Sequence, residues 1–159
     1  MKKLMIILGG GGHTAQLLKL VNMLGNNYSY EYVVEQNDKL SPKKIKIRGK
    51  ILRFKKTRNI KEFIGFSLAK QFVACVPAMR MMKKSEADTI ITCGPNFSIP
   101  LIVSGKMCNK KIIFIETWSR IYRKSLSGRF AYKIADKFFV QWPEMKKLYP
   151  KAIYAGRFA

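Results

Sequence analysis

Short runs of apolar residues alternate along the chain with longer segments whose apolar positions recur every three or four residues. The runs are typical of buried strands and the spaced segments of helices. We expect strands at residues 3–8, 30–34, 50–54, 88–92, 111–115, 137–141 and 152–154. We expect helices at residues 15–24, 59–84, 98–107, 129–135 and 143–148. Because the two kinds of element alternate, we predict a single α/β domain over residues 1–159, with a Rossmann-like, mostly parallel sheet and helices on both faces.

A glycine-rich turn separates the first expected strand from the first expected helix. Residues 9–12 are all glycine, and His13 and Thr14 follow them. Glycine permits a positive φ and lets a ligand approach the backbone closely. The amino terminus of the following helix attracts phosphate. His13 is the only histidine of the chain, and we place it where the loop becomes helix.

Three loops are expected at the same edge of the sheet. They follow the first, fourth and fifth strands, at residues 9–14, 94–97 and 116–120. Ligands of parallel sheets bind beyond the carboxyl ends of the strands. This edge is therefore the predicted functional site.

The helical segment at residues 59–84 carries more apolar side chains than one buried face needs. A transmembrane span is unfavourable, because a central charge costs about 2.5–3.5 kcal/mol on insertion scales. Pro77 also removes a backbone donor inside the helix. We expect one face to pack on the sheet, and we consider insertion of the surplus side chains into a membrane interface as a second role. The predicted membrane patch comprises Phe63, Phe66, Phe72, Met79 and Arg80.

The chain is strongly basic, with 31 lysines and arginines against 9 acidic residues and a net charge of +22. Such an excess predicts an acidic partner: a phospholipid surface, a nucleic acid or a polyanionic substrate. The three cysteines are far apart and form no disulfide or metal spacing, which favours a reducing, cytosolic setting. No Asp-x-Asp pair occurs, so we expect neither a metal nor a cofactor. About three residues lead into the first strand, and only about six apolar residues follow, too few for the hydrophobic segment of a signal peptide, so we expect none.

Four stretches resemble a known family. They are Gly-Gly-His-Thr after the first strand, Gly-Pro after the fourth, Ile-Glu-x-x-x-Arg after the fifth, and the run from Ser127 to Glu144. Together they resemble the acceptor subunit of split lipid-linked-oligosaccharide glycosyltransferases. The resemblance implies the fold of the amino-terminal half of a GT-B glycosyltransferase, similar to the matching half of MurG.

The same resemblance implies an activity. With a donor-binding partner subunit, the chain would transfer a sugar, N-acetylglucosamine or another hexose derivative, from a UDP-sugar. The acceptor would be a polyprenyl- or dolichyl-diphosphate-linked saccharide. Attachment would be peripheral, to an anionic membrane surface at its cytoplasmic face.

Two residues are candidates for the general base. His13 titrates near neutral pH, which suits that role, and Glu116 is the rival. The alternatives are a purely structural His13 and a Glu116 that pairs with Arg120. Phosphate groups of the acceptor are expected at Gly10, Gly11, Gly12, Thr14, Gly94, Asn96 and Arg120. The family usually has Gly-Pro-Gly where this chain has Gly-Pro-Asn, so Asn96 departs from the pattern.

Two other functions remain open at this point. Gly10-x-Gly12-x-x-Ala15, with Glu35 as a ribose-binding acid, fits a nicotinamide-dinucleotide fingerprint loosely, although no Ser/Tyr/Lys catalytic set is evident. The charge also permits a nucleic-acid-binding α/β domain. No recognised nucleic-acid motif accompanies it, and the charge is spread along the chain.

Overall fold

The described residues of the computed structural model, 1–55, 64–95 and 97–157, contain one sheet of seven strands. The strands are β1 (Lys3–Ile7), β2 (Ser29–Glu35), β3 (Lys50–Phe54), β4 (Thr89–Thr92), β5 (Lys111–Ile115), β6 (Lys137–Val140) and β7 (Ile153–Tyr154). Their order is β3-β2-β1-β4-β5-β6-β7, and every neighbouring pair is parallel. The expected parallel α/β sheet is confirmed, with β3 at one edge.

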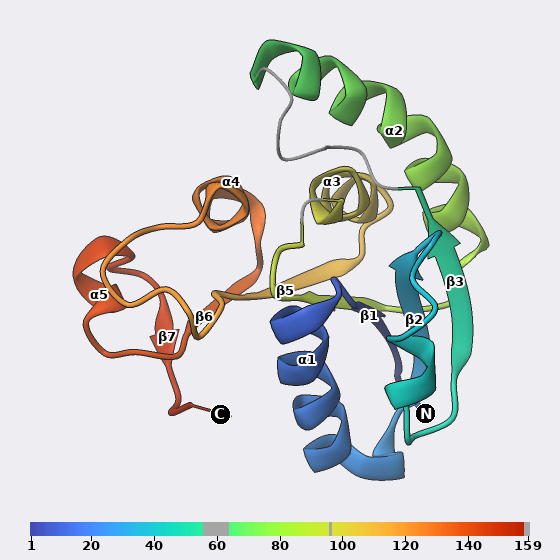
Figure 1. Ribbon diagram of the computed structural model, residues 1–159, viewed down its shortest axis with the longest axis horizontal. Coiled ribbons are helices and arrows are strands. Elements are labelled where there is room, and N and C mark those ends of the chain that lie inside the picture. The colour runs from blue at the N-terminus through green and yellow to red at the C-terminus, as the bar shows by residue number, and fades with distance from the viewer. Residues whose placement is uncertain (56–63, 96, 158–159) are drawn as a thin grey trace.

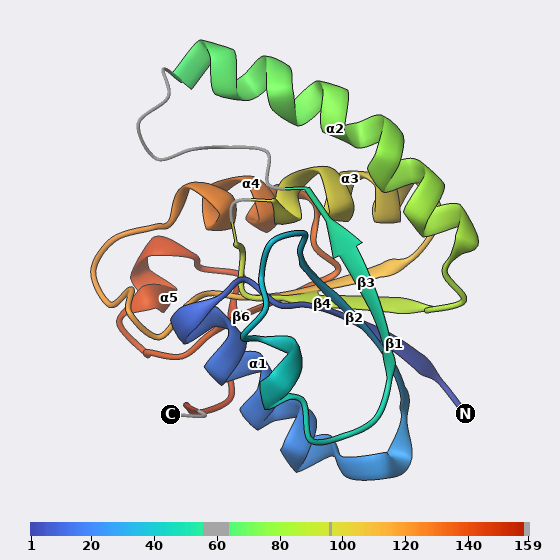
Figure 2. The same cartoon turned by 45° about the vertical axis from the view of Figure 1, so that its right-hand side comes forward.

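Helices cover both faces of this sheet (Figures 1 and 2). The helices are α1 (Gly11–Leu24), α2 (Ile64–Lys84), α3 (Ser98–Met107), α4 (Leu126–Ile134) and α5 (Met145–Leu148). Short 3₁₀ turns occur at Gly25–Asn27 and Pro42–Lys44. Helix α1 lies on one face, and α2, α3 and α4 lie on the other. Two buried apolar clusters, one on each face, make up the core.

Two helices begin earlier than the sequence predicts. Helix α1 begins at Gly11 instead of residue 15, and α4 begins at Leu126 instead of residue 129. The hydroxyl of Ser125 accepts a hydrogen bond from the N–H of Gly128 (2.8 Å) and caps α4. Glycine is a poor helix former, so propensity alone places the start of each helix too late. Helix α2 is described from Ile64, and residues 59–63 of the expected helix lie outside the described residues.

The order of strands brings three loops together. Strand β1 lies between β2 and β4, and Ile7 pairs with Thr92 at its carboxyl end. On the other side of β4, Thr92 pairs with Phe114 near the end of β5. The loops after β1, β4 and β5 are therefore neighbours, as expected for a site at the point where the strand order reverses.

Candidate functional site

The turn after β1 presents its backbone to open space. Gly10 precedes α1 with φ of 66°, and Gly11, its first residue, has φ of 52°. A Cβ atom at either position would meet nothing within 4 Å. Glycine is therefore required for the left-handed backbone and not for packing. No side chain caps α1, so the first N–H groups of this helix are available to an anion.

His13 lies in the first turn of α1, beside the loop after β4. It is half-buried, and its Nδ1 is buried with no hydrogen-bond partner among the described residues. A Cβ atom on Gly9 would lie 2.2 Å from Cβ of Pro95 and 3.3 Å from Cβ of His13, so these three residues meet closely. Burial lowers the pKa of His13, and the backbone of Cys93 opposes part of that shift. The imidazole is therefore neutral at pH 7, the form that accepts a proton.

Glu116 follows β5 and is buried, with 1% of its surface exposed. Its Oε2 accepts hydrogen bonds from the hydroxyls of Tyr149 (2.9 Å) and Ser125 (3.1 Å) and from the N–H of Ser125 (3.3 Å). Its Oε1 accepts from the N–H of Thr117 (3.1 Å). These partners, and not Arg120, hold the carboxylate. The buried carboxylate of Glu116 therefore ties the β5–α4 connection to Tyr149.

A buried glutamine pair connects α1 to the backbone of Glu116 and the hydroxyl of Thr117 at the end of β5. Gln16 Nε2 donates to Thr117 Oγ1 (3.0 Å), and Gln16 Oε1 accepts from Gln141 Nε2 (2.6 Å). Gln141 Nε2 also donates to the backbone oxygen of Glu116 (3.1 Å). The sequence analysis missed Gln16 and Gln141. The only signal was the position of Gln141 at the end of an expected strand.

Two predicted phosphate-binding residues are committed to packing. The Thr14 hydroxyl is buried and lies 3.0 Å from Oγ of Ser41. Gly94 is buried with φ of 78°, and a Cβ atom there would lie 2.5 Å from Oγ of Ser127 and 2.6 Å from Cζ of Phe114. The Ser127 hydroxyl donates to the Gly94 oxygen (2.8 Å). Gly94 therefore allows α4 to approach the loop after β4. Asn96 lies outside the described residues.

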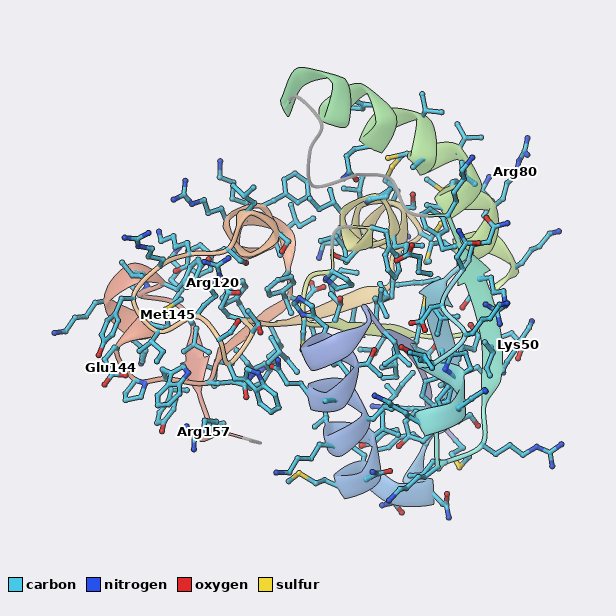
Figure 3. The ribbon with its side chains drawn as sticks, viewed as in Figure 1. Lys50, Arg80, Arg120, Glu144, Met145 and Arg157 are labelled. Carbon is cyan, nitrogen blue, oxygen red and sulfur yellow. The ribbon has the colours of Figure 1, made fainter. Side chains whose placement is uncertain are left out.

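Arg120 is exposed, on the α4–α5 side of the molecule (Figure 3). Arg80 projects from α2 on the other side of the same view. Arg120 therefore remains available to an anion near the end of β5. Across residues 1–55, 64–95 and 97–157, no three His, Cys, Asp or Glu side chains gather in a way that could hold a metal ion.

The predicted membrane patch is partly exposed on α2. Phe72 has 77% of its surface exposed, and Arg80 is also exposed. Met79 is half-buried, with its sulfur 3.4 Å from Sγ of Cys108, so it turns toward α3. Val73 and Val76, which belong to the surplus apolar residues of this helix but not to the predicted patch, are also exposed. Phe63 and the side chain of Phe66 lie outside the described residues.

None of the described helices combines the length and the apolar content that crossing a bilayer requires. The exposed apolar residues of α2 lie on the helix that packs against α3.

The fold matches part of larger enzymes. MurG from Acinetobacter baumannii superposes with a TM-score of 0.72 at 16% identity, over 90% of this chain and 42% of that one. A UDP-GlcNAc 2-epimerase from Neisseria meningitidis, bound to UDP-GlcNAc, gives a TM-score of 0.71 at 9% identity, over 98% of this chain and 47% of that one. The chain thus spans less than half the length of these structures, and the likeness concerns the fold alone.

The sequence relatives are matched over most of their length. The mouse protein named UDP-N-acetylglucosamine transferase subunit ALG14 is 30% identical over 178 residues, which cover 98% of this chain and 82% of that protein. The human protein of the same name is 27% identical, over 97% of this chain and 82% of its own length. Residues 4–158 match the model of a family described as oligosaccharide biosynthesis protein Alg14 like. The chain belongs to this Alg14-like family.

Proposed function

We propose that the chain is the acceptor-side subunit of a two-subunit glycosyltransferase at the cytoplasmic face of a membrane. The complete enzyme transfers N-acetylglucosamine from its UDP derivative to a saccharide linked to polyprenyl or dolichyl diphosphate. The names of the family relatives support the reaction class and a role as one subunit of a larger enzyme. The observation that carries the proposal is an open glycine turn beside a half-buried His13, on a chain whose relative named as a transferase subunit is matched over 82% of its own length.

The chemistry needs a base and a site for negative charge. His13 takes the proton of the acceptor hydroxyl while the hydroxyl oxygen bonds to the anomeric carbon of the donor sugar. The bond from that carbon to the diphosphate breaks, and UDP leaves with the electron pair. Backbone N–H groups at Gly10 to Gly12 stabilise phosphate charge near the reacting atoms without a metal. The partner subunit holds most of the donor.

The test is recovery of the chain with its partners from the source cell, followed by a transfer assay. We expect a second α/β protein, and transfer of GlcNAc from UDP-GlcNAc to a polyprenyl-diphosphate sugar only when both chains are present. Transfer by this chain alone would refute the two-subunit arrangement. Saturable binding of a nicotinamide cofactor, or of duplex DNA without preference for anionic vesicles, would support one of the two other functions.

The exposed face of α2 is expected to attach the chain to the membrane. Replacing Phe72, Val73 and Val76 by serine should weaken binding to phosphatidylglycerol vesicles at least about tenfold, measured by co-sedimentation. A fully buried side chain of this kind is worth about 1.5 kcal/mol or more, and three side chains at even partial depth exceed the 1.4 kcal/mol of a tenfold change.

A matched control removes exposed apolar side chains elsewhere. Met23 and Leu40 have 70% and 68% of their surfaces exposed and lie away from α2. Replacing both by serine should leave vesicle binding within about twofold of the parent. Equal losses in the two variants would show that α2 is not the attachment surface.

A further inference from the structure

A strongly basic pocket of about 680 Å³ lies beside the β5–α4 connection. The pocket is lined by residues of this connection, of α4 and of the end of α5. No acidic side chain is among the lining residues. Tyr132 and Tyr149 contribute aromatic surface to its wall. The cationic residues of the pocket are Arg120, Arg123, Lys124, Arg129 and Lys133.

None of these five cations has a carboxylate partner within the part of the chain that the structure describes. The ion pairs described are elsewhere, between Lys3 and Glu86 and between Lys106 and Asp136. Lys124 lies over the ring of Tyr149, with Nζ 4.9 Å from the ring centroid. The mutual repulsion of five positive charges around one pocket favours the binding of an anion.

The wall of the pocket is held in place from behind. Tyr149 donates its hydroxyl proton to the buried Glu116, which also accepts from Ser125 at the start of α4. The ring of Tyr132 packs against Tyr149 with centroids 4.8 Å apart, and its hydroxyl accepts from the N–H of Lys151 (2.8 Å). A wall fixed in this way reduces the cost of ordering side chains when a ligand binds.

The pocket adjoins the glycine turn. The indole Nε1 of Trp118 lies 3.8 Å from the position of a Cβ atom on Gly12. The backbone oxygen of Trp118 accepts from Nε1 of Trp142 (2.7 Å), which fixes the turn after β5. Arg120 follows Trp118 by two residues and lines the pocket. Arg120 therefore places one edge of the pocket two residues along the chain from the contact with the glycine turn.

We propose that this pocket binds a diphosphate group, at a site separate from the glycine turn. Two linked phosphates match five cations better than one does, and guanidinium groups bind phosphate oxygens in pairs. The identity of the natural ligand rests on the proposed function: it is the diphosphate of the acceptor lipid. In such an acceptor the diphosphate is bonded to the first sugar, so for an acceptor with a single sugar the accepting hydroxyl lies one sugar ring away from the pocket.

Binding of inorganic pyrophosphate to the full chain, measured by titration calorimetry, tests the site directly. We expect saturable binding that is tighter than binding of inorganic phosphate. The double variant Arg123→Gln, Lys133→Gln should bind pyrophosphate at least about tenfold more weakly, since charge-assisted hydrogen bonds are lost. Absence of saturable pyrophosphate binding by the parent chain would overturn the proposal.

The control variant, Lys146→Gln with Lys147→Gln, has the same change of net charge. Both lysines are exposed on α5 and neither lines the pocket. This variant should bind pyrophosphate within about twofold of the parent. An equal loss in both variants would overturn the proposal, because net charge alone would then explain the binding.

Vesicles distinguish the two lipid sources of phosphate. Neutral phosphatidylcholine vesicles that carry an isoprenyl diphosphate should bind the parent chain better than the Arg123→Gln, Lys133→Gln variant, and free pyrophosphate should compete. Phosphatidylglycerol vesicles should not distinguish the two chains to the same extent. A loss confined to phosphatidylglycerol vesicles would assign the pocket to bilayer headgroups and contradict the diphosphate assignment.

Transfer kinetics with the assembled enzyme separate this proposal from the proposed function. The Arg123→Gln, Lys133→Gln variant should raise KM for the lipid acceptor at least about fivefold, with little change in KM for the UDP-sugar. Transfer with an unchanged KM for the acceptor would overturn the proposal for the pocket and leave the proposed function standing. Pyrophosphate binding without any transfer activity would overturn the proposed function and leave the pocket standing.

Discussion

Replacing His13 by glutamine is expected to lower transfer by the assembled enzyme about 100- to 10,000-fold, the usual contribution of a general base. Glutamine keeps a polar side chain of similar reach but accepts no proton at neutral pH. His13 is half-buried, and its Nδ1 has no hydrogen-bond partner among the described residues, so a side chain of similar size should be accommodated without loss of folding. Initial rates with saturating acceptor, beside a thermal melt of the variant, measure the two effects separately.

The pH dependence of transfer distinguishes a base from a structural histidine. Burial lowers the pKa of His13 below the ordinary 6.5. The folded chain therefore binds fewer protons at His13 than the unfolded chain, so the stability that depends on neutral His13 is present above pH 6.5 and is lost as pH falls.

The acidic limb of the pH profile of kcat/KM should have its midpoint below 6.5 and should be absent in His13→Gln. A limb that persists in the variant would exclude His13 as the base.

The central strands of the sheet were predictable from the sequence because they are buried on both sides, as in β1 and β2. Runs such as residues 111–115 read as continuous apolar segments, and their alternation with helices leaves few topologies. The start of α1 was not predictable in the same way. Four glycines are typical of a loop, yet only Gly9 and Gly10 precede the helix, and Gly11 adopts a positive φ within its first turn.

The polar contacts behind the site left no comparable signal. Gln16 and Gln141 are 125 positions apart and meet at 2.6 Å. Tyr149 reaches Glu116 across 33 positions. The spacing of apolar residues predicts which side of an element is buried. It does not predict which polar group of a distant element will form a hydrogen bond with a buried polar side chain. The sequence located Glu116 correctly at the end of β5 but offered Arg120 as its partner.

Replacing Gly128 by alanine is expected to destabilise the chain by roughly 3 kcal/mol or more. The added Cβ atom would lie 2.2 Å from Oε2 of Glu116 and 2.7 Å from both Oγ of Ser125 and the hydroxyl of Tyr149. Overpacking alone costs about 1–3 kcal/mol. Displacing the donors of a buried carboxylate adds about 1–3 kcal/mol for each unsatisfied group. In a domain of this size, Tm should fall by roughly 6–12 °C, measured by circular dichroism.

Gly12→Ala is the matched comparison, because it adds the same methyl group at the start of another helix. Its Cβ atom would meet only Nε1 of Trp118, at 3.8 Å, which is an ordinary contact. Alanine also favours the helix by about 0.5–1 kcal/mol over glycine, so Tm should hold or rise slightly. The Gly128→Ala chain should in addition lose pyrophosphate affinity, since Tyr149 forms part of the pocket wall. Equal melting temperatures for the two variants would contradict the argument, because the carboxylate of Glu116 would then not fix the position of α4 against Tyr149.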